Sequence, residues 1–319
     1  MKLSNFTQNL LSTGLVQPRE IAETWMRTTI GWIMLTTAVA GIAMNSHVLV
    51  NYLNWKMTSF SILCSSKTVS NLIIIGAYFV YNAPITILNN FDGVTFPNVL
   101  VNQMVSYGVY LLGPVTQFAV SINRLLVMVF VKQAVIQNNQ KITLVVLSIF
   151  WLISLSITAI TTLDSCSVVY IPELLNWFSG GCDDQIGNLV MAFVVLIAIL
   201  SNLCNLVVVV KLATSTNKGF LDSESARRRK RRSKKLFVQN CIQDWIFAID
   251  SINSTFIDLL NDGILFRFAL DIYSNLMTPV LDGLIMLFFN YEKKPRLKVL
   301  AVKKGTTTGS QAGGSASRF

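Results

Sequence analysis

Seven long apolar segments run along the chain, and shorter polar stretches separate them. Each segment holds the roughly 20 residues that an α-helix needs to cross a hydrocarbon core about 30 Å thick. We predict an all-α membrane protein whose seven-helix bundle occupies residues 30–289, with helices at 30–53, 69–88, 104–131, 142–163, 186–212, 236–260 and 264–289. The last two segments are the least apolar, because they contain Asp244, Asp250, Asp271 and Asp282.

The composition agrees with a protein that lies mostly in a membrane. Of the 319 residues, 52% are hydrophobic and 13% are charged, whereas a soluble domain carries about 25% charged residues. The formal net charge of +10 would suit nucleic-acid binding, but the sequence has no zinc-finger spacing and no aromatic RNA-binding motif. We therefore expect no nucleic-acid partner, and we expect the basic loops to face anionic membrane lipids.

One polar stretch sets the predicted orientation of the bundle. Residues 227–235 carry eight positive charges in nine positions. A single Lys or Arg at the centre of a membrane helix costs about 2.5–3.5 kcal/mol, so this run lies in water. The positive-inside rule places it in the cytoplasm, with the N-terminus outside and the C-terminus inside. In this topology the cytoplasmic side, counting the ends of the apolar segments, holds 22 of the 26 Lys and Arg residues, among them Lys56 and Lys67.

Two polar segments flank the bundle. Residues 1–29 are expected to form an extracellular segment, in which Asn5 begins a sequon for N-glycosylation. Residues 290–319 are expected to form a cytoplasmic tail, and its Gly-, Ser- and Thr-rich end predicts partial disorder.

Arg124 lies at the cytoplasmic end of the third segment, directly after Asn123. An arginine at this boundary can simply extend its charge to the membrane surface. Alternatively, it is a switch that moves from partners inside the bundle to a G protein. The third segment has no other charge, and Asn45, Asn71 and Trp151 occur at spacings similar to the anchor positions of rhodopsin-like receptors. The switch hypothesis assigns G-protein coupling to Asn123, Arg124, Arg227, Lys230 and Lys234.

Polar residues inside the apolar segments are the next candidates. Charged groups within a membrane must face a polar interior, pair with another group or become neutral. We predict a polar network within the bundle, formed by Asn45, Asn71, Asp282 and Asn290, with sodium binding at Asp282 as an open alternative. Asp250 is expected either to contact a ligand or to support the structure. The candidate ligand contacts are Gln103, Tyr107, Tyr110, Asp250, Asn253 and Asp258.

Cys166 and Cys182 share the loop after the fourth segment, on the predicted outer side. In that oxidising compartment a disulfide closing about 15 residues would contribute roughly 3 kcal/mol in the chain-entropy model. Two free thiols are the alternative. We expect the disulfide.

Several classes of function lack their motifs. The zinc-protease, serine-hydrolase and phosphate-loop patterns are absent, no metal site can be built around the single histidine, and the seventh segment has no lysine for a retinal Schiff base. We expect no enzyme, no metal and no cofactor. A channel or transporter with the aspartates along an ion path stays open, as does a non-signalling accessory protein. The odd number of segments and the absence of an internal repeat count against a transporter.

Four stretches resemble the nematode serpentine receptor class x (Srx) chemoreceptors. They are GIAMN at 41–45, SFSILC at 59–64, FVQNCIQD at 237–244 and LDGLIMLFFN at 281–290. The family is similar to rhodopsin-like G-protein-coupled receptors. The resemblance implies a receptor in the cell membrane of sensory cilia that binds a small molecule and activates a heterotrimeric G protein. Receptor dimerisation stays open.

The sequence departs from the rhodopsin-like pattern at three places. Asn123 stands where an acidic residue usually precedes the switch arginine, the sixth segment has Trp245 but no proline, and the seventh has Asp282 and Asn290 without the usual Asn-Pro-x-x-Tyr. Because Asn123 cannot form a salt bridge with Arg124, we predict a raised basal activity.

Overall fold

The computed structural model describes residues 21–54, 57–88, 95–129, 133–163, 168–179, 183–216, 224–257, 260–261 and 263–290, and the structural statements below concern these residues. The helices are α2 (Thr24–Leu53), α3 (Ser59–Ala77), α4 (Ala83–Leu88), α5 (Phe96–Gln103), α6 (Leu112–Val129), α7 (Gln133–Leu163), α8 (Asp183–Thr216), α9 (Glu224–Ile252), α10 (Ile264–Phe268) and α11 (Ser274–Asn290). The strands are β1 (Val168–Ile171) and β2 (Asn176–Ser179). Short irregular turns join α3 to α4, α5 to α6 and α10 to α11, so these elements form seven helical segments.

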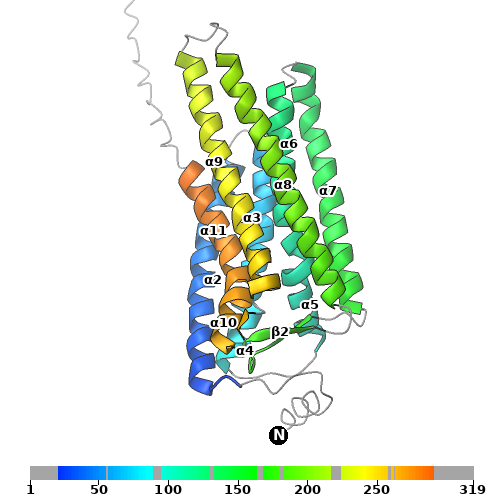
Figure 1. The fold of residues 1–319 in the computed structure, drawn as a ribbon, viewed down its shortest axis with the longest axis vertical. Helices are drawn as coiled ribbons and strands as arrows, with labels where there is room; N and C mark the ends of the chain where they lie inside the picture. Colours follow the sequence, from blue (N-terminus) through cyan, green and yellow to red (C-terminus); the bar gives the residue numbers. More distant parts are fainter. Residues whose placement is uncertain are drawn as a thin grey trace, which may run out of the picture.

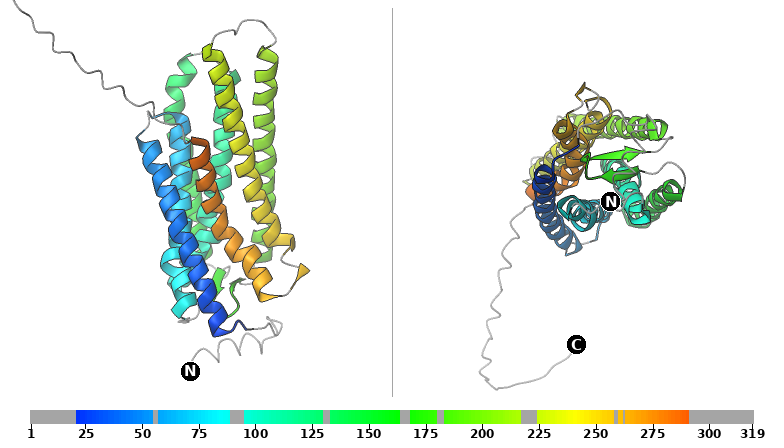
Figure 2. Two further views of the ribbon diagram at one scale, coloured as in Figure 1. Left: turned by 90° about the vertical axis from the view of Figure 1, so that its left-hand side faces the viewer. Right: turned by 90° about the horizontal axis from the view of Figure 1, so that it is seen from below.

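The seven segments run side by side along the long axis of the molecule (Figure 1). α2 packs against α3 and α11, α3 packs against α6, and α6 packs against α8. α8 in turn packs against α9, which contacts α11 and so closes the ring, while α7 packs outside against α3, α5 and α6. Figure 2 shows the same ring from below. The predicted all-α, seven-helix membrane fold is confirmed.

Large apolar side chains cover the outer surface of the bundle, as a lipid-facing surface requires. Six described helical segments are long and apolar enough to cross a membrane: Thr24–Leu53, Ser59–Leu88, Phe96–Leu126, Gln140–Thr162, Asn188–Lys211 and Ile264–Phe289. α9 is more polar, but its polar residues face inward, where Gln239, Gln243 and Asp250 are buried. Its exposed positions Val238, Ile242, Trp245 and Ile249 recur at helical spacing. α9 therefore presents an apolar face outward and is the sixth helix of the bundle.

The second helical segment begins at Ser59, ten residues before the predicted start at residue 69. Thr58 caps this helix, because its side chain accepts a hydrogen bond from the Ser61 backbone N–H. The sequence-based boundary failed because the first turns contain polar residues that face the interior. The assignment of Lys67 to a cytoplasmic loop is therefore wrong: this side chain is buried inside the bundle.

A β-hairpin, which the sequence did not predict, lies across one end of the bundle (Figures 1 and 2). β1 and β2 pair antiparallel, with Val168 opposite Ser179 and Ile171 opposite Asn176, and all four residues of β1 are buried. The hairpin turn is tied to the start of the first helical segment, since Ala22 N–H donates to the Glu173 carbonyl at 2.9 Å. We call this end the hairpin end and the opposite end, where Arg231 and Lys234 of α9 are exposed, the basic end.

Four helical segments contain a π-helical turn in the half of the bundle near the hairpin. These turns span Tyr78–Asn82, Met104–Gly108, Asn253–Ile257 and Ala269–Tyr273. Such single turns are rare, and they occur frequently at functional sites. The hairpin-side half is thus the irregular part of an otherwise regular bundle.

Candidate functional site

The centre of the bundle holds a buried ion pair between Lys67 on α3 and Asp282 on α11. Lys67 Nζ lies 2.6 Å from Asp282 Oδ1, and only 1% and 0% of the two residues are exposed. Lys67 Nζ also donates a 2.8 Å hydrogen bond to Gln117 Oε1 on α6 and lies 5.2 Å from the centroid of the Phe247 ring. Because burying an unpaired charge is costly, these contacts explain how α3 carries a lysine inside the bundle.

Amide side chains complete the surroundings of the Asp282 carboxylate. Gln243 Nε2 on α9 donates to Asp282 Oδ1 at 2.8 Å, and Asn71 Nδ2 on α3 donates to Oδ2 at 2.7 Å. Asn71 Nδ2 also lies 3.3 Å from Asn45 Oδ1, and Asn45 Nδ2 donates to the Pro279 carbonyl at 3.2 Å. We name this group, which joins five helices, the central hub: Asn45, Lys67, Asn71, Gln117, Gln243 and Asp282.

Two glycines permit close helix contacts beside the hub. A Cβ atom added to Gly283 on α11 would lie 2.5 Å from Asn45 Nδ2, and one added to Gly113 on α6 would lie 2.5 Å from Phe247 Cζ. Real Cβ atoms do not come this close to other atoms, so both positions require glycine for the observed packing. The hub thus depends on backbone shape as well as on polar side chains.

A second polar group lies nearer the hairpin. Asp250 on α9 receives hydrogen bonds on both carboxylate oxygens: Tyr110 Oη donates to Oδ2 at 2.7 Å, and Ser274 Oγ of α11 donates to Oδ1. Close by, Tyr78 Oη donates to Asn275 Oδ1 at 3.0 Å. We name Tyr78, Tyr110, Asp250, Ser274 and Asn275 the hairpin-side cluster.

Hydrogen bonds from two asparagines connect the hairpin to the helical bundle. Asn98 on α5 brackets the Tyr170 backbone, because its Oδ1 accepts from the Tyr170 N–H and its Nδ2 donates to the Tyr170 carbonyl, both at 3.2 Å. Asn102 Oδ1 accepts from Trp177 Nε1 at 3.0 Å. Burial raises the pKa of the Tyr170 hydroxyl, which lies 3.0 Å from Thr86 Oγ1. These contacts hold the hairpin as a cover over the bundle.

Arg124 lies at the other end of the bundle without a carboxylate partner among the described residues. Its Nη1 donates to the Leu236 carbonyl at the start of the membrane part of α9, and its guanidinium lies 5.2 Å from the centroid of the Phe60 ring. The salt bridges in the described part of the chain do not include Arg124. Ser201 instead donates to the nearby Asp244 carboxylate at 2.8 Å. Arg124 is therefore held by a neutral acceptor and an aromatic face.

The family comparison agrees with this architecture. A family model described as serpentine type 7TM GPCR chemoreceptor Srx matches residues 35–290. The chain belongs to this family. The match runs from the first helical segment to the end of the seventh, and it confirms the resemblance that the four sequence stretches carry. A comparison with curated proteins gives no match. The protein is thus a serpentine chemoreceptor with several helices in the membrane.

The structure of this chemoreceptor brings some predicted site residues together. Asn45, Asn71 and Asp282 lie in the central hub, and Tyr110 and Asp250 contact each other in the hairpin-side cluster. Gln103, in contrast, is turned toward the α7 backbone, where its Nε2 lies 3.4 Å from the Thr161 carbonyl. Further residues have only a general placement: Tyr107 is buried in the third segment, Asn253 is half-buried in a π-helical turn, and Asn123 is buried beside Arg124.

Several predictions fall outside what the structure describes. Asn5, Cys166, Cys182 and Asp258 lie outside the described residues, as do the side chains of Arg227, Lys230 and Asn290. Lys234 is described and exposed on α9. These assignments stay predictions.

Sequence reasoning missed three members of the hub: Lys67, Gln117 and Gln243. One signal was available for Lys67, which stands four residues before Asn71 and therefore shares a helix face with it.

The ammonium of Lys67 also bears on sodium binding. Since this cation already contacts Asp282, the carboxylate needs no metal ion to balance its charge.

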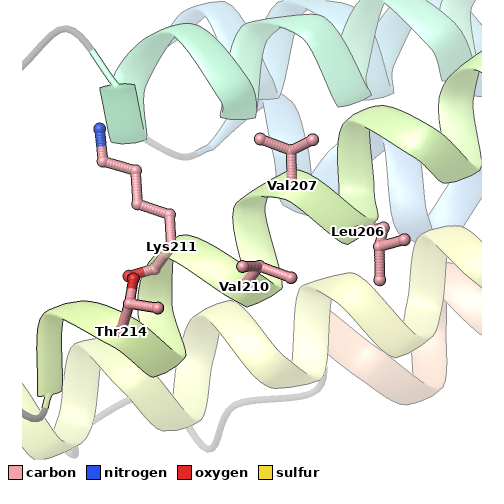
Figure 3. Close-up of a pocket in the computed structure, with 5 residues that line it drawn as sticks. All are labelled: Leu206, Val207, Val210, Lys211 and Thr214. Carbon is pink, nitrogen blue, oxygen red and sulfur yellow. The ribbon is translucent and has the colours of Figure 1, made fainter.

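A groove of about 370 Å³ lies on α8, away from both polar groups (Figure 3). Its lining residues all come from this helix: Leu206, Val207, Val210, Lys211 and Thr214. All five are exposed on the outer surface of the bundle. The groove therefore belongs to the lipid-facing surface and not to a site inside the bundle.

Proposed function

We propose that this chemoreceptor binds a small molecule in its hairpin-side half and activates a heterotrimeric G protein at its basic end. The hairpin end would face the outside and the basic end the cytoplasm, in the cell membrane of a sensory cilium. The observation that carries the proposal is the central hub, in which one ion pair and four amide side chains link the ligand-side and G-protein-side halves of the bundle.

A buried ion pair is a poor device for stability alone. Replacing such a pair with well-packed apolar residues is often neutral or stabilising, whereas removing one partner is strongly destabilising. Its geometry is also demanding, since both charges need their partners at hydrogen-bond distance. A pair that joins two helices in this way favours a small number of discrete helix arrangements, as a receptor switch requires.

The hairpin-side cluster and the hub share four helical segments, and on the second of them Tyr78 follows Asn71 by seven residues. Tyr110 precedes Gln117 by seven residues, Asp250 follows Gln243 by seven, and Ser274 precedes Asp282 by eight. Two turns of helix separate each pair, or about 10–12 Å at 1.5 Å per residue. A ligand that shifts these segments at the cluster would therefore shift the partners of the Lys67–Asp282 pair. The ligand acts by binding one arrangement more tightly than the other.

Arg124 would be the switch residue at the basic end. Its acceptor, the Leu236 carbonyl, is neutral. Releasing Arg124 from this carbonyl would therefore cost less electrostatic energy than releasing it from a buried carboxylate. Once released, Arg124 would meet the G protein together with Arg227, Lys230 and Lys234. Anionic lipids would bind the same basic surface.

The disulfide between Cys166 and Cys182 fits this proposal. The hairpin register places Val168 opposite Ser179, and the two cysteines stand two residues before the first strand and three after the second. A disulfide needs Cα atoms about 4.4–6.8 Å apart, so the bridge requires the two chain segments beyond the strands to come together. The bridge would clamp the open end of the hairpin that covers the ligand site.

The test is a G-protein dissociation assay in cells, with wild type and Arg124→Ala compared at equal surface display. We expect a basal or ligand-evoked signal in the wild type and its loss in the variant. A ligand-evoked current that persists when G proteins are blocked would instead show a channel. Asp282 argues against that channel, because its charge is already matched by Lys67 and it is fully buried.

A further inference from the structure

We propose that the ligand carries a protonated amine and that Asp250 binds it. This inference rests on the proposed function, since it names the chemical class of the ligand for the same receptor. It begins with a difference between two buried carboxylates. Asp282 has the ammonium of Lys67 at 2.6 Å, whereas Asp250 contacts hydroxyl groups.

Asp250 is as deeply buried as carboxylates that form an ion pair usually are, but it has no cationic partner among the described residues. Only 5% of the residue is exposed, and among the described residues no lysine, arginine or histidine forms a salt bridge with it. A carboxylate offers about four lone-pair sites, and the hydroxyl groups of Tyr110 and Ser274 occupy two of them. Acceptor capacity therefore remains for a cationic donor, which a buried carboxylate favours strongly.

The Tyr110 and Ser274 hydroxyl groups also fix where that donor would bind. Tyr110 reaches one oxygen from the third helical segment, and Ser274 reaches the other from the seventh, while Asp250 itself belongs to the sixth. The carboxylate is thus held at the meeting point of three segments. An ammonium group there would contact the segments that also carry Gln117, Gln243 and Asp282 of the central hub.

The backbone around Asp250 gives an independent indication of a ligand site. Each of four neighbouring segments has its π-helical turn beside this cluster: Tyr78 begins one turn, a second ends two residues before Tyr110, a third begins three residues after Asp250, and the fourth ends immediately before Ser274. Single π turns occur frequently at functional sites. Four turns around one carboxylate mark this level of the bundle as a place for binding.

Aromatic rings next to the carboxylate suit the same ligand class. The Tyr110 and Phe247 rings meet edge to face, with centroids 5.9 Å apart, and the Phe247 ring already lies 5.2 Å from the Lys67 ammonium. Aromatic faces attract alkylammonium groups through their quadrupole. Carboxylic acids, in contrast, would be repelled by Asp250, and alcohols would lack the charge.

The experiment compares matched amines, alcohols and acids of one skeleton. Suitable probes are 2-phenylethylamine, 2-phenylethanol and phenylacetic acid, together with hexylamine, 1-hexanol and hexanoic acid. Two readouts are measured: G-protein dissociation in cells, and the thermal unfolding midpoint of the purified receptor with each probe. We expect the amines alone to evoke a signal and to raise the midpoint.

The variants are Asp250→Asn, Asp250→Glu and, as a matched control, Asp271→Asn. Asp271 is a second buried aspartate in the same half of the bundle, so the control removes an equal charge. We expect Asp250→Asn to weaken the amine response by about 10- to 100-fold, the range for a lost charge-assisted hydrogen bond. Asp250→Glu, which keeps the charge, should restore much of the response, and Asp271→Asn should change it by less than about threefold.

The outcomes separate the ligand class from the proposed function. Basal signalling that depends on Arg124, combined with no effect of the amines in either readout, overturns the amine proposal and leaves the receptor function intact. Equal responses to alcohols and amines also overturn it. If Asp250→Asn fails to reach the surface, the wild-type probe series and Asp250→Glu still decide the question. An amine that raises the unfolding midpoint without any G-protein signal supports the site and contradicts the signalling function.

Discussion

The buried charges at the centre of the bundle differ from those at its two ends. Lys67 and Asp282 neutralise each other in the hub, whereas Asp250 near the hairpin and Arg124 at the basic end contact neutral groups. Asp250 and Arg124 also differ in sign, while the hairpin end holds in addition the buried Arg27–Glu173 ion pair. The Lys67–Asp282 pair at the centre is already neutralised and needs no further partner. Asp250 and Arg124 can each bind a partner of opposite charge. This difference is what we expect of a protein that receives one molecule at one end and contacts another at the opposite end.

The largest effect should come from breaking the pair at the centre. We expect Lys67→Met to destabilise the receptor by about 3–5 kcal/mol, because Asp282 is left buried without its cation. The measurement is the thermal unfolding midpoint of the purified receptor, with surface display as a second readout.

The double variant Lys67→Met with Asp282→Asn is the control for that change. It removes both charges, and the introduced amide can still form hydrogen bonds with the neighbouring amide side chains, so most of the stability should return. If the double variant is as unstable as the single one, the pair is not what holds the centre together.

The hairpin end should also depend on a covalent cross-link. We expect Cys166→Ser and Cys182→Ser each to lower stability by about 3 kcal/mol, and the double variant to add little, because either change opens the same loop. Mobility on gels with and without reductant measures the bridge itself. Additive effects of the two substitutions would contradict a shared disulfide.

A smaller effect should come from the packing around Asn45. Gly283→Ala places a Cβ atom 2.5 Å from Asn45 Nδ2, so we expect a loss of about 1–3 kcal/mol as the hub is pushed apart. Gly76→Ala on α3 is the matched control, since a Cβ atom there meets nothing within 4 Å. It should be neutral or stabilise the helix by up to about 1 kcal/mol. Equal losses at the two glycines would refute the close contact.

The fold was predictable because the bilayer leaves few choices. A chain that crosses hydrocarbon must satisfy its backbone internally, so apolar length alone indicated seven helices. The same reasoning misplaced Lys67, because hydropathy does not separate a lysine that faces a carboxylate inside the bundle from one in a loop. Its partner, Asp282, lies 215 residues away along the chain, and only tertiary packing brings them together.

The candidate sites were predictable in part. Asn45, Asn71 and Asp282 are polar residues in apolar helices, and such residues must face the interior, so their meeting followed from their chemistry. The hairpin gave no such signal, because each of its two strands has only four residues. The burial of these strands comes from contact with the bundle, which the local sequence does not reveal. The π-helical turns were equally hidden, since no residue type specifies them.

The smallest effect tests the basic end by making it resemble the centre. Asn123→Asp places a carboxylate beside Arg124, which contacts the Leu236 carbonyl and the Phe60 ring. The added attraction should hold Arg124 in the bundle more firmly, and we expect basal G-protein dissociation to fall by about two- to fivefold at equal surface display. Asn202→Asp on α8 is the matched control, because it adds the same charge at a half-buried position of another helix. Basal signalling that is unchanged in Asn123→Asp, or lowered equally by Asn202→Asp, would mean that the missing carboxylate does not set the activity of the unliganded receptor.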